Sequence, residues 1–351
     1  MDREKLDSLR AKYAVAPPGD VHDARFKKVV DMVFAGTDRR PKPYEGVATF
    51  LGAPLRLDAP GAQDWGGLDV ALVGVPMDLG VTNRPGARFG PRAVRAIERI
   101  GPYHHVHAIA PFGEVGAADV GDVPFRSRFS LGDSHEDIEA FYARLVAAGV
   151  APVSVGGDHS ISLPILKALG AARPLGLVHI DAHCDTAGVF EGAKFHHGGP
   201  FRQAVLAGVL DPERTIQIGV RGGAEYLWEF SYASGMTVIH AEEVSTLGLA
   251  RVVEKIAKVA GDGPTYISFD VDSLDPAFAP GTGTPEVGGL STREAMQLLR
   301  GCAGLQIVGG DVVEVAPQYD ATTNTAQAAA QMMFEILSLV ALTRIKARQT
   351  K

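Results

Sequence analysis

From about residue 70 onward, short apolar runs alternate with stretches of helical periodicity, and this alternation restricts the fold more than any other feature. We expect the apolar runs to form strands at Val70–Val75, Pro152–Val155, Leu175–Ile180, Thr215–Val220, Thr237–His240, Thr265–Phe269 and Gln306–Val315. Strands that alternate with helices pair in parallel, because each helix carries the chain back across one face of the sheet. The sequence therefore predicts an α/β fold, a parallel sheet between two layers of helices, with its ligand site beyond the carboxyl ends of the strands.

Several helical stretches have recognisable ends. In residues 134–149, Ser134 can cap the first turn and Gly149 can end the helix. Ser291 and Glu294 have the spacing of a capping box. Residues 321–342 predict a long final helix. We see no internal repeat and no break for a second domain, so residues 67–351 are expected to form one domain.

Residues 1–66 lack this alternation. They contain one amphipathic helix, expected around Val21–Phe34, followed by a connector rich in proline and glycine. We interpret residues 1–66 as an arm that packs on the main domain or on a neighbouring subunit.

Charge and cysteine content exclude several classes of protein. The chain has 34 Lys and Arg against 41 Asp and Glu, a net charge of −7, and no basic run, so nucleic-acid binding is not expected. Only Cys184 and Cys302 are present, without C-x-x-C spacing, which favours a reducing compartment. The charged N-terminus does not resemble a signal peptide, and no apolar run approaches the ~20 residues of a membrane span. We therefore expect a soluble cytoplasmic protein.

Acidic residues and histidines collect at the ends of four predicted strands: Asp158, His159, Asp181, His183, Asp185, Asp270, Asp272 and Glu314. In an extended chain, residues two apart point the same way, so each D-x-D or D-x-H-x-D stretch is expected to project its side chains together. Buried charges are costly unless they are paired or bound to metal. A lone D-x-D is more often a turn or a helix cap, and His159 alone could cap a helix. Three acidic strand ends on neighbouring loops favour a metal site instead.

The residue types indicate which metal site this is. Four aspartates and two histidines are more ligands than one ion needs, which suits two divalent ions that share carboxylates. Without cysteine ligands, we expect an oxygen-rich catalytic site such as manganese and not structural zinc, and we expect Cys184 to be packed. Residues 279–289 lack the lysine of a phosphate loop and are expected to form a wall of the site. The four arginines of residues 83–95 leave phosphate binding and surface pairing both open.

Five stretches together resemble the ureohydrolase (arginase/agmatinase) family, and its agmatinase and guanidinobutyrase branch in particular. They are GVTNRPGARFGPRAVR, GGDHS, DAHCD, SFDVDSLDPAFAPGTGTPEVGG and DVVEVAP. The resemblance runs from about residue 45 to the C-terminus. It implies that residues 67–351 form one catalytic α/β/α domain with a mostly parallel, eight-stranded sheet. It also implies trimers or hexamers, and hydrolysis of a guanidino compound to urea and an amine with two Mn²⁺ ions, or Ni²⁺ as in some relatives.

Carried over by motif, the resemblance assigns a role to each site residue. One ion is held by His159, Asp181, Asp185 and Asp270, and the other by Asp181, His183, Asp270 and Asp272, with Asp181 and Asp270 bridging. Three residues receive catalytic roles: Glu314 receives the guanidinium group, Asp185 relays a proton to the leaving amine, and His197 shuttles protons. His196 stands beside His197 and leaves that last assignment ambiguous.

The substrate and two other functions stay open. Agmatine, cleaved to putrescine and urea, is the leading candidate, because the negative net charge slightly favours a cationic tail. A guanidinobutyrase, a guanidinopropionase, or a hydrolase of guanidine or a biguanide would use the same motifs. More distant possibilities are a single-zinc deacetylase of the same general fold and a non-catalytic partner subunit. The complete ligand set argues against both.

Overall fold

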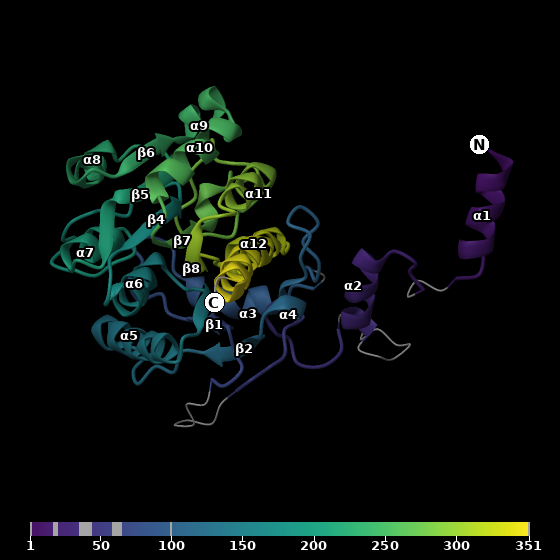
Figure 1. Ribbon diagram of the computed structural model, residues 1–351. Helices are drawn as coiled ribbons and strands as arrows, with labels where there is room; N and C mark the ends of the chain where they lie inside the picture. The colour runs from purple at the N-terminus through teal and green to yellow at the C-terminus, as the bar shows by residue number, and fades with distance from the viewer. Residues whose placement is uncertain (1, 17–19, 35–43, 58–64, 99, 350–351) are drawn as a thin grey trace.

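One sheet of eight parallel strands forms the centre of the protein, in the order β2-β1-β3-β8-β7-β4-β5-β6. The computed structural model describes residues 2–16, 20–34, 44–57, 65–98 and 100–349 (Figure 1). The strands are β1 (Val70–Gly74), β2 (Ala117–Asp122), β3 (Ala151–Val155), β4 (Leu175–Ile180), β5 (Leu210–Val220), β6 (Thr237–His240), β7 (Pro264–Asp270) and β8 (Gln306–Val313). The predicted α/β class and parallel sheet are confirmed.

Helices cover both faces of this sheet (Figure 1). One face carries α3 (Gly90–Arg95), α9 (Ala241–Leu247), α10 (Leu249–Ala260), α11 (Thr292–Gly301) and α12 (Asn324–Gln349). The other carries α5 (Leu131–Ala147), α6 (Ser162–Gly170), α7 (Pro200–Leu206) and α8 (Glu229–Ser234). Successive strand residues point to opposite faces, so Leu177 of β4 packs in the core beneath α5 to α7 and Val178 packs in the core beneath α10 to α12. The domain therefore has three layers, as predicted.

Short elements complete the chain: α1 (Arg3–Tyr13), α2 (Ala24–Phe34), α4 (Pro111–Glu114), and 3₁₀ helices at Phe50–Gly52, Ala87–Phe89, His159–Ile161, Glu225–Trp228, Val271–Ser273 and Pro317–Tyr319. Helix α1 was not predicted, and α2 matches the predicted amphipathic helix. Helix α1 lies away from the body of the molecule in Figure 1. Helix α2 contacts the body through an ion pair of Lys28 with Glu114 and an edge-on contact of Phe26 with Tyr103. Phe50, within the stretch interpreted as an arm, is fully buried in the core.

Strand β2 escaped prediction because it does not look like a buried strand. Residues 117–122 read AADVGD, with one β-branched residue and two aspartates. The strand lies at the sheet edge, where it pairs with β1 on one side and has a single bridge to Leu55 on the other. Asp119 is nevertheless fully buried, since Arg95 and the backbone N–H groups of Phe50 and Gly121 all donate to its carboxylate. These donors compensate the buried charge.

Helix ends were predicted with mixed success. The capping box of Ser291 and Glu294 is confirmed, and Gly149 ends α5 with a φ of 71°. The predicted start at Ser134 is wrong, because α5 begins one turn earlier. Ser130 Oγ accepts from the backbone N–H of Asp133, whereas the Ser134 hydroxyl donates to the Ser130 carbonyl. Either serine satisfies the sequence rule, and the earlier one adds a further turn to the helix.

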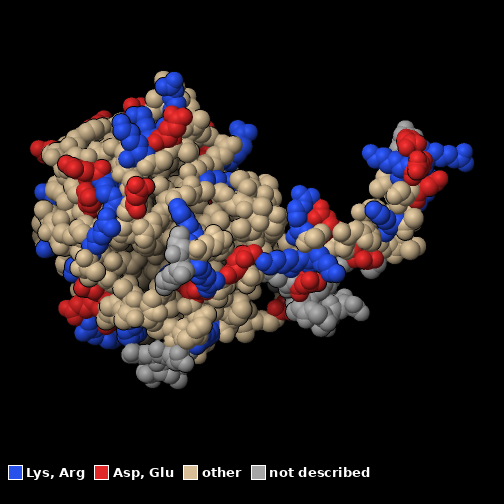
Figure 2. Space-filling view, viewed as in Figure 1, with Lys and Arg blue, Asp and Glu red and all other residues tan. Residues whose placement is uncertain are grey.

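Among the described residues, α12 alone is long and apolar enough to cross a membrane by length and composition, which the search for apolar runs had not indicated. However, 72% of its most apolar window is buried inside the molecule, as expected of a core helix. On the face shown in Figure 2, Lys and Arg side chains are interspersed with Asp and Glu.

Candidate metal centre

The four strands at the centre of the sheet deliver the predicted site residues to one edge. Strands β3, β8, β7 and β4 are neighbours in that order. His159 follows β3, Glu314 follows β8, Asp270 ends β7, and Asp181 follows β4. The expectation that the acidic strand ends lie on neighbouring loops is confirmed, and residues up to 155 positions apart in sequence meet there.

The side chains converge through tight turns and not along extended strands, so the predicted same-face geometry is wrong. Strand β4 ends at Ile180, and the Asp181 carboxylate accepts from the backbone N–H of His183 at 2.7 Å. Asp270 accepts in the same way from the N–H of Asp272 at 2.8 Å. Aspartate favours such turns because its short side chain reaches the N–H two residues on. Each motif therefore folds back on itself at the end of its strand.

The first group of ligand atoms surrounds the ring of His159. Its Nδ1 lies 2.9 Å from Asp185 Oδ2, 3.0 Å from Asp181 Oδ2 and 3.3 Å from Asp270 Oδ2. Asp185 reaches this position from a left-handed backbone, with a φ of 51°. All four residues are buried. These are the residues expected to hold one ion.

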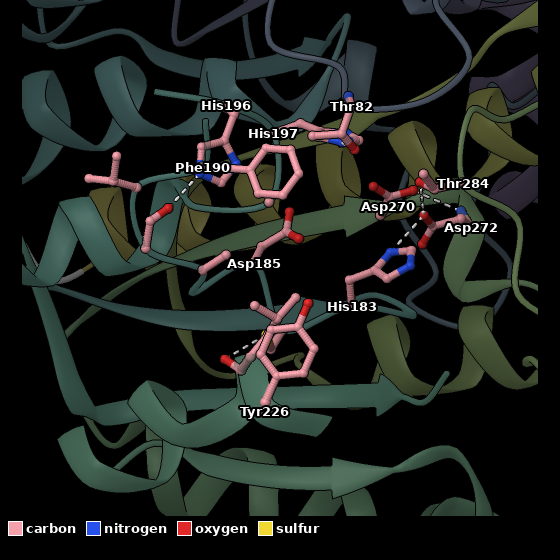
Figure 3. Close-up of a pocket in the computed structure, with 16 residues that line it drawn as sticks. Thr82, His183, Asp185, Phe190, His196, His197, Tyr226, Asp270, Asp272 and Thr284 are labelled. Atoms are coloured by element: carbon pink, nitrogen blue, oxygen red, sulfur yellow. Dashed lines mark hydrogen bonds and ion pairs between the residues drawn. The ribbon is translucent and has the colours of Figure 1, made fainter. Parts of the chain in front are cut away.

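The second group lies around His183. Its Nδ1 is 3.1 Å from Asp272 Oδ2 and 3.5 Å from Asp181 Oδ1 (Figure 3). The two oxygens of Asp181 thus face different groups, one each. Asp270 contributes Oδ2 to the first group, while its Oδ1 accepts from the Asp272 backbone. Asp181 is therefore the residue whose geometry joins the two groups.

The tautomer of His159 provides a test of whether a cation fits. Ser268 Oγ donates to Asp311 at 2.6 Å, so it accepts from His159 Nε2, which lies 2.7 Å away. Asp311 is fully buried and also accepts hydroxyl groups from Ser162 and Tyr266. The proton of a neutral His159 ring is thus fixed on Nε2. Its Nδ1 lone pair, which has no hydrogen-bond donor among the described residues, then faces three carboxylate oxygens. Such an arrangement needs a cation, and a metal ion fits it.

Charge in the cluster leads to the same conclusion. Burial and the charges of Asp272 and Asp181 raise the pKa of Asp270 well above its usual range, and burial raises the pKa of Asp272 to about 6. Burial alone would lower the pKa of His159, but the carboxylates of Asp181 and Asp185 outweigh it and raise that pKa well above normal. Four buried carboxylates in one cluster match the charge of two divalent cations.

His197 and Glu314 form a pair beside this cluster. His197 Nδ1 donates to Glu314 Oε1 at 2.9 Å, and the backbone N–H of His159 donates to the same oxygen. Glu314 Oε2 is buried without a hydrogen-bond partner among the described residues. The backbone of Glu314 is left-handed, with a φ of 64°. Such strain at a buried polar residue is typical of functional sites.

The other ring nitrogen of His197 faces Thr82. Nε2 lies 2.7 Å from Thr82 Oγ1 and 3.1 Å from Thr82 N. A neutral ring accepts from the Thr82 amide, and a protonated ring donates to the Thr82 hydroxyl. Burial alone would lower the pKa of His197, but the charge of Glu314 and its hydrogen bond raise the pKa to about 9. His196, by contrast, donates Nε2–H to the Gly188 carbonyl and has no carboxylate partner among the described residues.

A cavity of about 340 Å³ opens on the cluster. In Figure 3, His183, Asp270 and Asp272 lie on one side of it, and Phe190 and His196 lie on the other. His197 lines the cavity, whereas Glu314 is 1% exposed and lies behind His197. The wall away from the carboxylates is mostly apolar and includes Ala187, Gly188, Val189, Phe190, Tyr226 and Leu227.

The 279–289 loop and the arginine-containing residues 83–95 pack against each other at this site. Thr284 of the 279–289 loop lines the cavity, which confirms that this loop forms a wall. Arg84 donates to the carbonyl groups of Thr282 and Gly283. Arg88 pairs with Asp78, and Arg95 pairs with Asp119 and Asp122. Three of the four arginines of residues 83–95 therefore have partners within the chain, so no phosphate is needed to explain their presence.

Sequence reasoning missed five residues that touch the site or its ligands: Thr82, His179, Ser268, Thr284 and Asp311. Thr284 Oγ1 donates to Asp272 Oδ2 at 3.3 Å, and the contacts of Thr82, Ser268 and Asp311 are given above. Four of the five lie within the stretches that carry the family resemblance. The sequence could have indicated these four only as hydroxyl or carboxylate side chains within those stretches. His179, in β4, carried no signal beyond its place two residues before Asp181.

Comparisons with known proteins show the family to which the chain belongs. Residues 68–338 match the profile of the Arginase family. The chain is 49% identical to a guanidinopropionase of Pseudomonas aeruginosa, covering 86% of this chain and 96% of that protein. It is 46% identical to the mitochondrial agmatinase of Gallus gallus, covering 86% and 89% of the two chains. The solved structure of proclavaminate amidino hydrolase from Streptomyces clavuligerus superimposes with a TM-score of 0.81 at 35% identity, covering 86% of this chain and all of that one. This chain is a member of the arginase family.

Proposed function

We propose that the protein hydrolyses a small guanidino compound to urea and an amine, with two divalent cations bound at the cluster. The observation that carries this proposal is the position of Asp181, whose two carboxylate oxygens each face a separate histidine and carboxylate group. The names of the related guanidinopropionase, agmatinase and amidino hydrolase support the substrate class. The complete cluster gives no support to a non-catalytic subunit or to a single-zinc deacetylase.

His159, Asp181, Asp185 and Asp270 would hold one cation, and His183, Asp181, Asp270 and Asp272 would hold the other. Carboxylate oxygens and imidazole nitrogens without thiolates suit Mn²⁺, and Ni²⁺ is the alternative. When bound, the two cations would act as Lewis acids that lower the pKa of a water molecule, so that it can serve as the nucleophile near neutral pH. In the hydrolysis, a water oxygen would add to the guanidinium carbon, the bond from that carbon to the substituted nitrogen would break, and a proton would move to the leaving amine.

The protein's own residues bind the substrate and move that proton. Glu314 lies behind His197, and its Oε2 is a buried acceptor without a donor among the described residues, which suits a guanidinium N–H group that reaches past His197. His197 lines the cavity, and Glu314 holds a proton on it near neutral pH. We assign to His197 delivery of this proton to the amine, directly or through Asp185, and exchange of protons with solvent through its Thr82 side.

Agmatine is the first substrate to test. Among the described residues that line the cavity there is no Lys or Arg to pair with a carboxylate tail. Glu286 lies beside the site, with its Oε1 3.8 Å from His183 Nε2, and adds negative charge there. Both observations favour a cationic tail over an anionic one.

A urea-release screen tests the function. After its metal is removed with a chelator, the protein is expected to release no urea from any substrate. After dialysis against Mn²⁺ or Ni²⁺, it is expected to hydrolyse at least one of five compounds: agmatine, 4-guanidinobutyrate, 3-guanidinopropionate, guanidine and a biguanide. Arginine is included for comparison with the arginases. Metal analysis of the same samples should give two ions per chain. A reconstituted protein with fewer than one ion per chain would remove the two-cation site.

His197→Asn is expected to lower kcat by about 10²–10⁴-fold, because a positioned proton donor contributes that much. The pKa near 9 means that wild-type His197 is protonated at neutral pH and loses its proton as the pH rises through 9. The rate of the wild-type enzyme should therefore fall above about pH 9, and the variant should not show this fall in its pH–rate profile. The matched control is His196→Gln, which keeps a donor for the Gly188 carbonyl and is expected to change kcat little. The opposite ranking of the two variants would transfer the role to His196.

We further propose that the protein is a cytoplasmic homo-trimer or homo-hexamer. Helix α1 has no buried residue in the isolated chain, which suits an arm that packs on a neighbouring subunit. Sedimentation of the full chain beside a chain that begins at residue 20 measures the contribution of the arm.

A further inference from the structure

His179 lies against the cluster but belongs to neither proposed ligand set, and the mechanism above gives it no role. It lies in β4 and is fully buried, with Nε2 2.7 Å from Asp181 Oδ2. Its ring is close enough to His159, Asp181 and Asp185 for the four residues to hold a metal together. Two roles are therefore possible for His179: a metal ligand, or a residue that positions Asp181. The hydrogen bonds of its second ring nitrogen decide between them.

That second nitrogen, Nδ1, faces Gln217 of the neighbouring strand β5. His179 and Gln217 are paired in the register of the sheet, so the contact is set by the backbone. Gln217 Nε2 lies 2.5 Å from the Cys184 carbonyl and 3.0 Å from His179 Nδ1. A carbonyl oxygen only accepts, so the amide nitrogen of Gln217 must face Cys184. Its second hydrogen is then directed to His179 Nδ1.

The tautomer of His179 follows from this contact. Because Gln217 donates to Nδ1, the ring proton is on Nε2 and is donated to Asp181 Oδ2. Both ring nitrogens are thereby engaged, and no lone pair is left for a metal ion. We infer that His179 is a positioning residue, and that Gln217 and His179 together orient the carboxylate of Asp181 between the two cation sites. This inference rests on the proposed metal-dependent function.

Asp181 is held at both of its oxygens. The backbone N–H of His183 donates to Oδ1 at 2.7 Å, and His179 donates to Oδ2 at the same distance. The carboxylate therefore cannot rotate without losing a hydrogen bond, and each oxygen stays directed at its own group. Outer hydrogen bonds of this kind fix ligands and raise metal affinity.

Packing holds the ring of His179 as well. Phe201 of α7 is fully buried, with its ring centre 4.4 Å from that of His179 and 5.2 Å from that of His159. The rings of His179 and His159 themselves meet edge-on at 5.3 Å. One aromatic side chain thus holds a metal ligand and the positioning histidine in place together.

Two substitutions at His179 test the inference on the full-length protein. His179→Leu removes the donor to Asp181, and His179→Gln keeps an N–H donor on a side chain of similar reach. Affinity for Mn²⁺ is measured by competition with a chelator, and the number of bound ions by metal analysis. We expect His179→Leu to bind Mn²⁺ about 10–100-fold more weakly. His179→Gln should recover most of that loss, with two ions per chain.

The outcomes separate the possible roles. Equal affinity of His179→Leu and the wild-type protein would overturn the positioning role. A loss of one ion per chain in both variants would make His179 a ligand and would also overturn it. If His179→Leu does not fold, Gln217→Leu decides, because it leaves His179 in place and frees its tautomer. We expect weaker Mn²⁺ binding there, and unchanged binding would refute the inference. A wild-type protein that binds no metal would instead refute the proposed function.

Discussion

Asp181→Ala is expected to release no detectable urea and to bind neither cation tightly. Asp181 is the residue whose two oxygens face both groups of ligand atoms, at 3.0 Å from His159 Nδ1 and 3.5 Å from His183 Nδ1. Without its carboxylate each site loses a ligand and the two sites lose their connection. We expect kcat/KM to fall by at least about 10⁴-fold, the scale seen when a unit of the catalytic machinery is removed. Urea release and metal content, measured on the same preparation, check this result.

The matched control is Asp211→Ala, which removes the same charge at the start of β5. Asp211 accepts from the backbone N–H of Glu213 in an exposed position, so its loss should leave two ions per chain and normal turnover. An Asp181→Ala protein that keeps both ions would show that Asp181 does not bridge them.

Asp270→Asn extends the same prediction to stability. Its loss of metal binding should resemble that of Asp181→Ala, but the metal-free variant should be more stable than the metal-free wild-type protein. Burial and two neighbouring charges raise the pKa of Asp270 in the folded protein, so near neutral pH its ionised form costs free energy of folding. Asparagine removes that cost. In thermal unfolding, the Tm of Asp270→Asn should therefore be higher than that of the wild-type protein without Mn²⁺ and lower with Mn²⁺.

Glu314→Gln is expected to keep both cations and lose turnover. No oxygen of Glu314 lies in either ligand group, whereas its Oε1 accepts from His197 and from the backbone of His159. Glutamine keeps an acceptor of the same shape but removes the charge that binds a guanidinium group and holds the proton of His197. Loss of one such electrostatic contact typically lowers kcat by about 10²–10³-fold. Metal content and urea release measure the two effects separately.

The pH dependence of this variant gives a second measurement. Without the charge of Glu314, burial lowers the pKa of His197, so the alkaline fall in rate should move from about pH 9 to lower pH. Glu139→Gln, on the surface of α5, removes the same charge from a residue that does not line the cavity and serves as the control. Full activity in Glu314→Gln would remove Glu314 from the mechanism, and a loss of metal would make it part of the binding site.

Patterns that depend on neighbours in sequence were predicted well. The alternation of apolar runs and helices gave the α/β class, because strand and helix periodicities are local properties of the chain. The capping box at Ser291 and the end of α5 at Gly149 follow from local backbone chemistry in the same way. Strand β2 was missed because its burial depends on Arg95 and Phe50, which lie far from it in sequence.

In the site, too, local features could be predicted and long-range contacts could not. The residue types at four strand ends indicated a cation cluster, and the family resemblance divided those residues between two ions. The spatial order β3-β8-β7-β4 differs from the order along the chain, so only the fold shows why His159 and Asp270 meet. The predicted extended geometry failed because Asp181 and Asp270 each turn the backbone by accepting the N–H two residues on.

In the motif HIDAHCD, the sequence by itself determined that a buried strand ends in potential metal ligands, because residue types and their spacing are fixed by the chain. Only the tertiary structure decided the role of its first histidine. His179 resembled one more residue of a buried strand until β5 placed Gln217 beside it. A hydrogen bond between strands depends on sheet register, which no single segment of sequence contains. That register fixes the proton of His179, and through it the orientation of Asp181.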